Sequence, residues 1–353
     1  MADKTTTARE VSRATQHLKK IILFFLLTLL TACTSETATP EPGGFSFIVI
    51  GDTPYGPPDE VMLVEALPKI RAGAYPFIIH VGDFKGGGAP CTDALEERLE
   101  TLIATLAPTP VFYTPGDNDW TDCDRFKDPA TGVRTSDLDR LAGLRARFFS
   151  APLTAPAAFG ARRQETQPEN AAWRYGGVQF ATLHIVGTNN GRDWVVGDPL
   201  TRAATAADAR DAANLAWLAK TFAAAKTNGA RAVVIAMQAD MTDIKDKPKD
   251  VMCEDVAANA DHPCDGFTDL RAAIRDAARE FNGPVLLIHG DTAPFTLGQS
   301  FAGEEAKNLW RLNAAGDAGV GRTGQAYGTR DVTVVTINPS ADKPIAARGL
   351  LTE

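Results

Sequence analysis

Residues 45–52 read FSFIVIGD, a short apolar run rich in β-branched and aromatic residues that ends in Gly51-Asp52. Residues 77–83, FIIHVGD, repeat this design, and both stretches predict buried strands. Further strands are expected at 111–114, 173–186 (two strands joined by a Gly-Gly turn), 230–237, 284–290 and 331–337. Helical patterns separate them at 60–72, 94–107, 136–149, 208–227 and 268–281. This alternation predicts an α/β protein with mixed central β-sheets flanked by helices on both faces.

The composition excludes several classes of protein. The chain has 353 residues, of which 44% are hydrophobic and 23% charged, and these proportions exclude disordered, collagen-like and coiled-coil proteins. Residues 1–32 carry five basic and two acidic side chains, a net charge of +3, so the remainder carries −11 and the whole chain −8. An acidic body lacks the basic surface of a nucleic-acid-binding protein, and we expect no nucleic-acid partner.

Residues 1–33 have the pattern of an export signal. Lys19-Lys20 precede the apolar run 21–30, which is shorter than the roughly 20 residues that a membrane-spanning helix needs. The following Leu-Thr-Ala-Cys, which ends at Cys33, resembles the lipobox of bacterial lipoproteins. This resemblance implies that Cys33 is lipidated and becomes the first residue of the mature chain. The alternative is an ordinary signal peptide with an incidental cysteine.

The stretch after the cysteine predicts a tether. Residues 34–44, TSETATPEPGG, are rich in Pro, Gly and Thr and show no apolar period. We therefore expect residues 45–353 to fold as a single domain that the acylated N-terminus anchors to the lipid bilayer of the cell envelope, facing the periplasm. Thr34 is not the aspartate associated with retention in the inner membrane, which favours the outer membrane.

Four further cysteines follow the leader, at positions 91, 123, 253 and 264. An even number of cysteines in an exported protein indicates disulfides, and four cysteines allow three pairings. Cys253 and Cys264 bracket one short polar loop, so we pair them with each other and Cys91 with Cys123. Free thiols or a zinc site are the alternatives, but the Cys-x-x-Cys spacing typical of zinc sites does not occur.

Polar residues gather at the ends of the predicted strands. Four Gly-Asp pairs stand there, with their aspartates at Asp52, Asp83, Asp117 and Asp291. Ligands of open α/β sheets bind at the carboxyl ends of the strands, where these side chains would meet. Carboxylates that are crowded together repel one another unless they are protonated or bridged by a cation. The pattern therefore predicts a metal site, although any single Gly-Asp pair is also an ordinary turn signal.

In order and spacing, the segments FIVIGDTPY, FIIHVGDF, YTPGDNDW, VVIAMQAD and VLLIHGDT resemble the motifs of the calcineurin-like metallophosphoesterases. The resemblance implies a four-layer αββα sandwich and two metal ions, with Asp52 on the first metal and Asp83 bridging both. It places Asp117 at an asparagine-ligand position and Asn118 at the position of a histidine that assists the leaving group. The candidate metal ligands implied in this way are Asp52, Asp83, Asp117, Asn118, Gln238, His289 and Asp291. The candidate catalytic residues are Asn118, Asp119 and His289.

The departures from the family pattern concern histidine. Pro54 and Gln238 stand where the superfamily has histidines, and only four histidines follow the leader. The remaining donors are mainly oxygen atoms, which favour Mn²⁺, Mg²⁺ or Ca²⁺ over zinc or iron. We expect one or two divalent cations of this kind.

Two functions follow from this set of motifs. The first is metal-dependent hydrolysis of a phosphoester, with a phosphorylated small molecule or a phosphodiester as substrate. Asn118 in place of histidine removes a general acid, a group that typically contributes about 10²–10⁴-fold to the rate. The second is therefore a catalytically degenerate lipoprotein that uses the same pocket to bind a ligand or a partner in the envelope.

Overall fold

The computed structural model describes residues 44–245, 247–253, 263–321 and 323–352, all within one compact unit. The predicted leader, the lipidation site at Cys33 and all of the tether except Gly44 lie outside the described residues. Within the described ranges, none of the helices combines the length and the apolar character that a bilayer crossing requires.

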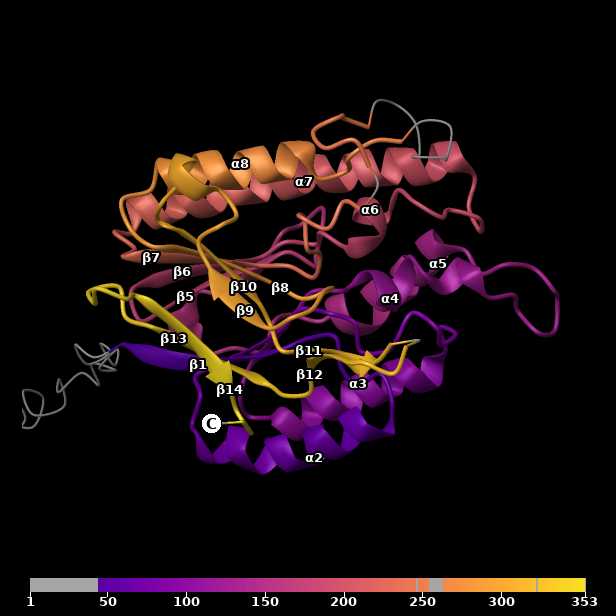
Figure 1. Ribbon diagram of the computed structural model, residues 1–353, viewed down its shortest axis with the longest axis horizontal. Coiled ribbons are helices and arrows are strands. Elements are labelled where there is room, and N and C mark those ends of the chain that lie inside the picture. Colours follow the sequence, from indigo (N-terminus) through magenta and orange to yellow (C-terminus); the bar gives the residue numbers. More distant parts are fainter. Residues whose placement is uncertain (1–43, 246, 254–262, 322, 353) are drawn as a thin grey trace, which may run out of the picture. The chain divides into compact units, whose positions relative to one another are not determined.

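A five-stranded sheet forms one half of the sandwich (Figure 1). Its central strand pairs in parallel with β2 on one side and antiparallel with β13 on the other. The order across the sheet is β14 (Ile345–Gly349), β13 (Thr333–Ile337), β1 (Phe45–Ile50), β2 (Ile78–His80) and β3 (Val111–Tyr113).

A seven-stranded sheet forms the other half. Four of its strands run parallel in the middle, and antiparallel strands flank them at both edges. The order is β4 (Arg162–Arg163), β5 (Ala171–Tyr175), β6 (Val178–Thr182), β7 (Ala232–Ala236), β8 (Val285–His289), β10 (Leu309–Asn313) and β9 (Thr296–Gly298). A separate two-stranded ribbon consists of β11 (Gly316–Val320) and β12 (Ala326–Thr329).

Two pairs of long helices cover the outer faces of the sheets. Apolar residues of α2 (Pro57–Ala72) and α3 (Asp93–Leu106) pack on the five-stranded sheet, and those of α7 (Leu200–Thr227) and α8 (Thr268–Arg279) pack on the seven-stranded sheet. The shorter helices are α4 (Asp117–Trp120), α5 (Asp137–Leu144), α6 (Gly187–Gly191), a π-helical turn η2 (Arg145–Phe149), and the 3₁₀ turns η1 (Cys123–Arg125), η3 (Ala157–Phe159) and η4 (Gly303–Glu305).

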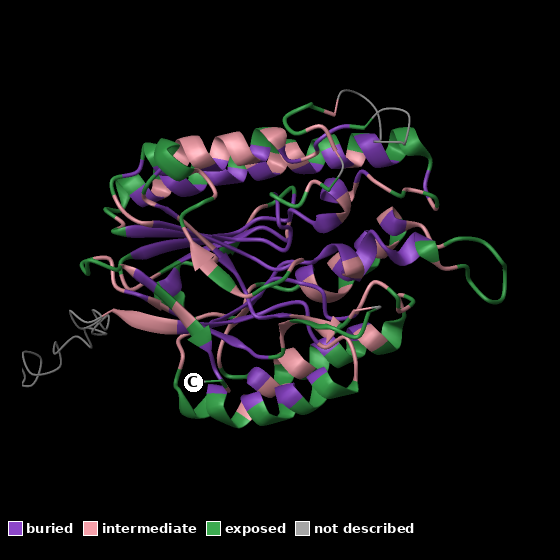
Figure 2. Cartoon of the chain, in the orientation of Figure 1, coloured by how far each residue is buried: buried purple, intermediate pink, exposed green. Residues whose placement is uncertain are grey.

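The alternation of apolar side chains in the strands explains the layering. Phe47 and Val49 of β1 face the seven-stranded sheet, whereas Ile48 and Ile50 face the helices α2 and α3. Because both faces of such a strand are covered, its sequence is apolar except for Ser46 near its start. Figure 2 shows the two sheets as the buried centre, with exposed residues on the outward faces of the helices. The predicted α/β class and the four-layer αββα sandwich are confirmed.

The sequence expectation differs from the structure mainly near the C-terminus. Only one strand was expected there, at 331–337, but five others, β9 to β12 and β14, lie beyond residue 290. They are short and rich in glycine or polar residues, as in GDAGV and AYGT, so they lack the apolar pattern of a buried strand. The helix expected at 136–149 exists as α5 followed by a π-helical turn.

Candidate functional site

The carboxylates at the strand ends depend on unusual backbone geometry. Asp52, Asp83 and Asp291 follow β1, β2 and β8 with φ angles of 52°, 58° and 70°. This left-handed region is uncommon for residues other than glycine, and residues held in it cluster at functional sites. The close approach of neighbouring strand ends to these carboxylates also requires glycine. A Cβ atom at Gly290 would overlap the carboxylate of Asp52, and one at Gly116 would overlap that of Asp83.

Hydrogen bonds connect these strand ends to one another. The backbone N–H of Asp291 donates to Asp52 Oδ1 over 2.8 Å. The hydroxyl of Tyr55 lies 3.2 Å from Asp52 Oδ1 and 3.0 Å from Asp83 Oδ2. Asn118 donates to Asp83 twice, from its backbone N–H over 3.0 Å and from its side chain over 2.9 Å. The predicted residues Asp52, Asp83, Asn118 and Asp291 are therefore neighbours.

Asp117 belongs to the same cluster. Its Oδ1 accepts a hydrogen bond from Gln238 Nε2 over 2.8 Å, and its Oδ2 accepts one from the hydroxyl of Thr188 over 2.7 Å. A Cβ atom at Gly187 would lie 2.6 Å from Asp117 Oδ2 and 2.7 Å from Asp291 Oδ1. We call Asp52, Asp83, Asp117 and Asp291 the acidic cluster.

Burial and repulsion between carboxylates disfavour the charged forms of Asp52, Asp83 and Asp291. Burial is the main cause that raises the pKa values of Asp52, Asp83 and Asp291 well above their usual range, and neighbouring carboxylates raise them further. Asp117 is a source of repulsion in all three cases. Among the described residues, no salt bridge within 4 Å neutralises any member of the cluster. Such a site is relieved either by protons or by a cation.

Gln238 reaches the cluster as a hydrogen-bond donor. The backbone N–H of Gly187 donates to its Oε1 over 2.6 Å, which fixes the orientation of the side-chain amide. Its Nε2 then faces the carboxylates and donates to Asp83 over 3.2 Å as well as to Asp117. In this orientation the amide oxygen, the atom that would bind a cation, is turned away from the cluster.

His289 is not brought to the acidic cluster. Val285 and Leu287 of β8 pack with residues of α7 and α8, and the period of two places His289 on that same outer face. Its Nδ1 lies 2.7 Å from the carbonyl oxygen of Gly290, and its charged neighbours are Asp240 and Arg311. Burial lowers the pKa of His289 to about 4. The proposed roles as ligand and proton donor therefore lack a contact with the site.

Asp119 holds the backbone at the strand ends. Its carboxylate accepts hydrogen bonds from the N–H groups of Asp83, Phe84 and Gly116 over 2.8–3.1 Å, and from the hydroxyl of Tyr113 over 3.0 Å. The residue is fully buried. These four bonds give Asp119 a positioning role for Asp83 rather than contact with a substrate.

A cavity of about 450 Å³ opens above the acidic cluster. Asp83, Asp117, Asn118 and Asp291 line it, together with residues that the sequence motifs did not single out as site residues. Its lining also includes Tyr55, Thr188, Asp317, Arg125, Trp194 and Tyr327. The volume falls within the range of small-molecule sites.

The family model for calcineurin-like phosphoesterases matches residues 45–292. The chain belongs to the calcineurin-like phosphoesterase family. The matched range contains all four carboxylates of the acidic cluster, and it confirms the resemblance carried by the sequence motifs. Among curated proteins, no match to this family member was found.

Three solved structures are similar to this phosphoesterase-family chain at low identity. A dimetal phosphatase from Danio rerio is 13% identical, with a TM-score of 0.42 over 88% of this chain and 98% of that one. The anchor in the inner membrane complex of Plasmodium is 11% identical, with a TM-score of 0.38 over 88% and 90%. A hypothetical protein from Thermus thermophilus is 13% identical, with a TM-score of 0.36 over 86% and 98%.

The family implies divalent metal ions, and the donor chemistry of the cluster fits them. Three buried carboxylates, Asp52, Asp83 and Asp117, together with the half-buried Asp291, offer the oxygen ligands that hard cations prefer. Within the described part of the chain, however, no group of three or more His, Cys, Asp or Glu side chains is arranged so that it could hold a metal ion. N–H and O–H groups of Asn118, Gln238 and Tyr55 hydrogen-bond to the carboxylates instead.

Tyr55, Thr188 and Asp317 were not among the predicted site residues. Tyr55 stands in the GDTPY motif itself, three residues after Asp52. Asp317 follows Gly316 and so forms another Gly-Asp pair, but no strand was expected before it. Burial, and secondarily Asp117, raises the pKa of Asp317 to about 6. Counting every Gly-Asp pair, whether or not a strand precedes it, would have found this residue.

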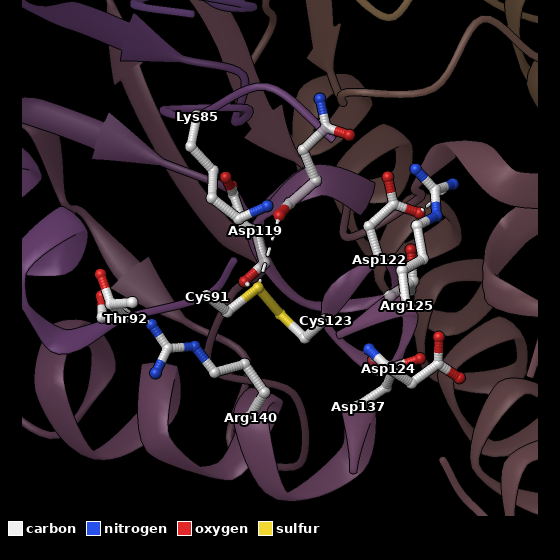
Figure 3. The surroundings of a disulfide bond; sticks show 12 residues. Lys85, Cys91, Thr92, Asp119, Asp122, Cys123, Asp124, Arg125, Asp137 and Arg140 are labelled. Carbon is white, nitrogen blue, oxygen red and sulfur yellow. Dashed lines mark hydrogen bonds and ion pairs between the residues drawn. A yellow bond between two sulfur atoms is a disulfide. The ribbon is translucent and has the colours of Figure 1, made fainter. Parts of the chain in front are cut away.

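The predicted disulfides are both present, and one of them joins two walls of the cavity. Cys91 pairs with Cys123 and Cys253 with Cys264, at Cα–Cα distances of 5.4 and 5.0 Å. Figure 3 shows Cys123 close to Asp122 and Arg125. Arg125, which lines the cavity, reaches across to the carbonyl oxygen of Gly87 over 3.5 Å. The first disulfide therefore ties the segment after β2 to the turn after α4.

Proposed function

We propose that this member of the calcineurin-like phosphoesterase family hydrolyses phosphoesters with one or two divalent cations bound by Asp52, Asp83, Asp117 and Asp291. The observation that carries the proposal is the convergence of these carboxylates, three of them buried, at a cavity of about 450 Å³ that Asp83, Asp117 and Asp291 line. Oxygen donors without a histidine favour Mn²⁺, Mg²⁺ or Ca²⁺. A phosphorylated small molecule or a phosphodiester is the substrate class.

The bound cations and the residues around the cavity would have separate roles in phosphoester hydrolysis. Bound cations would act as Lewis acids toward the phosphoryl group. Asn118 also lines the cavity, and its side-chain amide would donate to a phosphoryl oxygen by giving up its bond to Asp83 or to the hydroxyl of Tyr55. His289 faces the other side of its sheet and has no contact with the acidic cluster among the described residues, so no imidazole is in place to protonate the leaving group. The site therefore favours phosphoesters whose leaving groups are stable anions, such as aryl phosphates.

We further propose that the protein is exported and anchored to the envelope through lipid on Cys33, facing the periplasm. The basic residues, the short apolar run and the Leu-Thr-Ala-Cys sequence support this proposal. The two disulfides support it as well, because such bonds persist in oxidising compartments. Cell fractionation tests the anchor: a Cys33→Ser variant should no longer be found in the detergent-extracted membrane fraction. An unchanged distribution between membrane and soluble fractions would contradict lipidation.

Hydrolysis of p-nitrophenyl phosphate tests the proposed activity. The protein without residues 1–33 is treated with chelator, and Mn²⁺, Mg²⁺ or Ca²⁺ is then added back. We expect metal-dependent turnover that is lost in Asp83→Ala and kept in Asp139→Ala, which changes an exposed carboxylate. Absence of metal-dependent turnover, or turnover that survives Asp83→Ala, would contradict the proposal.

A binding protein without catalysis is the second candidate function, and the orientation of Gln238 favours it. This side chain donates hydrogen bonds to the cluster where the family has a histidine ligand. A lipoprotein of this kind would bind a ligand or an envelope partner in the same cavity. Calorimetry that detects a phosphonate ligand in the absence of any turnover would support this candidate over the first.

A further inference from the structure

Trp194 combines two features that are rare for a large aromatic residue. Its side chain is exposed, with 74% of the residue accessible, although it lines the cavity above the acidic cluster. Its backbone is left-handed, with φ of 61°, which is uncommon for a bulky residue. Neither feature stabilises the fold, since burial of the ring and a relaxed backbone would both be more favourable.

The backbone on both sides of Trp194 is held firmly. The N–H of Asp193 donates to the carbonyl oxygen of Thr188 over 3.2 Å. The N–H groups of Val196 and Gly197 donate to Asp124 Oδ2 over 2.6 and 2.9 Å. Among the described residues, the indole ring itself has no hydrogen-bond, ring-stacking or cation partner. The structure therefore holds the backbone that carries Trp194 and leaves the faces of its ring free.

Tyr327 presents a second aromatic ring to the same cavity from a different element. It lies on β12, is 43% exposed and pairs with Gly319 of β11. A Cβ atom at Gly319 would lie 2.5 Å from the hydroxyl oxygen of Tyr327, so a side chain at this position would displace the ring. The ring thus lies over the β11–β12 ribbon, and the connection between α6 and α7 carries Trp194.

We propose that Trp194 and Tyr327 form a subsite for a planar aromatic group of the substrate, which makes the substrate class an aromatic phosphoester. Both rings line the same cavity as Asp83, Asp117 and Asp291 of the acidic cluster, so a ligand that fills this cavity would meet both groups. Aromatic faces stack on indole and phenol rings without requiring a particular base or aryl group. This inference rests on the proposed function, because it assigns the phosphoryl group to the acidic cluster.

Lys245 brings a positive charge to the cavity that contains this subsite. It lines the cavity, and no hydrogen-bond or ion-pair partner for its ammonium group occurs among the described residues. The other lysine of the lining, Lys247, is paired with Asp193. An anionic group on the aromatic part of the substrate would therefore find Lys245 free to bind it.

Binding of phosphonates tests the subsite without depending on turnover, because a carbon–phosphorus bond is not hydrolysed as an ester. The ligands are methylphosphonate, phenylphosphonate and a 5′-phosphonate analogue of adenosine monophosphate, measured by calorimetry in the presence of Mn²⁺. We expect the aromatic ligands to bind about 10-fold more tightly than methylphosphonate. If the adenosine analogue binds more tightly than phenylphosphonate, the substrate is a nucleotide. If phenylphosphonate binds more tightly, the substrate is an aryl phosphate.

Substitutions at Trp194 test whether its ring causes the preference for aromatic phosphonates. Trp194→Ala should reduce the preference for aromatic ligands to less than about 3-fold, while Trp194→Phe should keep most of it. Val133→Ala is the matched control, because it changes an exposed apolar side chain outside the cavity. Equal binding of all three ligands to the unaltered protein, or an unchanged preference in Trp194→Ala, would overturn the subsite. An aromatic preference without hydrolysis of any phosphoester would instead overturn the proposed activity alone.

Discussion

Gln238 donates a hydrogen bond from Nε2 to Asp117 Oδ1 over 2.8 Å, at the point where the family pattern has a histidine ligand. The opposite end of the amide accepts from the N–H of Gly187, so a simple rotation by 180° would place two donors against each other. The side chain therefore stabilises the crowded carboxylates as a neutral donor. A cation that binds Asp117 would compete with the Gln238 amide for the same carboxylate oxygen.

A Gln238→Glu substitution tests this role. It replaces the donor with a further carboxylate, so the metal-free protein should lose about 3–5 kcal/mol of unfolding free energy at pH 8. Because the new carboxylate is also a cation ligand, adding Mn²⁺ or Ca²⁺ should restore much of the loss. Chemical denaturation with and without metal measures both effects.

Gln167→Glu is the matched control for that experiment. Gln167 is equally buried, but its amide donates to Asn214 Oδ1 over 2.9 Å, outside the acidic cluster. This variant should also be destabilised, yet metal should not restore it. If metal restored both variants alike, or neither, the interpretation of Gln238 would be wrong.

The stability of the protein as a function of pH tests whether Asp317 is destabilised by burial and by the charge of Asp117. Burial, and secondarily Asp117, raises its pKa to about 6, so the folded protein holds this proton more tightly than the unfolded chain does. Its contribution to stability is therefore fully present below about pH 3.9 and is lost as the pH rises through about 6. Asp317→Asn, which is neutral throughout, should raise the melting temperature of the metal-free protein at pH 8 and leave it nearly unchanged at pH 4. A pH-independent effect of the substitution would contradict this account.

The sequence predicted the acidic cluster and the buried strands that precede its members because both depend on local patterns. A continuous apolar run followed by Gly-Asp specifies a buried strand and the turn after it, as at Asp52 and Asp83. The position of His289 was not predictable in the same way. Both faces of β8 are buried, so its apolar sequence does not show which face meets the helices.

The remaining differences arise from contacts between distant segments. The amide of Gln238 takes its orientation from Gly187, 51 residues earlier in the chain. Asp317 reaches the site on a ribbon whose strand β11 has no apolar alternation. Trp194 reads in the sequence as an ordinary aromatic residue, and only its exposure and backbone in the folded chain distinguish it.

Asp119 gives a prediction that separates positioning from catalysis. Its carboxylate accepts four hydrogen bonds, and an asparagine in its place would turn an N–H group toward donors. Asp119→Asn should therefore cost about 3 kcal/mol of unfolding free energy at pH 8. Asp139→Asn, on the surface, should change it by less than about 0.5 kcal/mol. Full stability of Asp119→Asn together with lost activity would instead indicate a direct catalytic role.

The two disulfides should differ in their effects on stability and on the cavity. The bond Cys91–Cys123 spans 32 residues and Cys253–Cys264 spans 11, so the loop-closure model gives about 4 and about 3 kcal/mol for their removal. The first bond also joins two cavity walls, through Cys123 next to Asp122 and Arg125 (Figure 3). Replacing Cys91 and Cys123 by serine should therefore weaken phosphonate binding as well as lower the urea midpoint. Replacing the other pair should lower the midpoint less and leave the Kd nearly unchanged, and equal effects on Kd would show that the first bond does not shape the cavity.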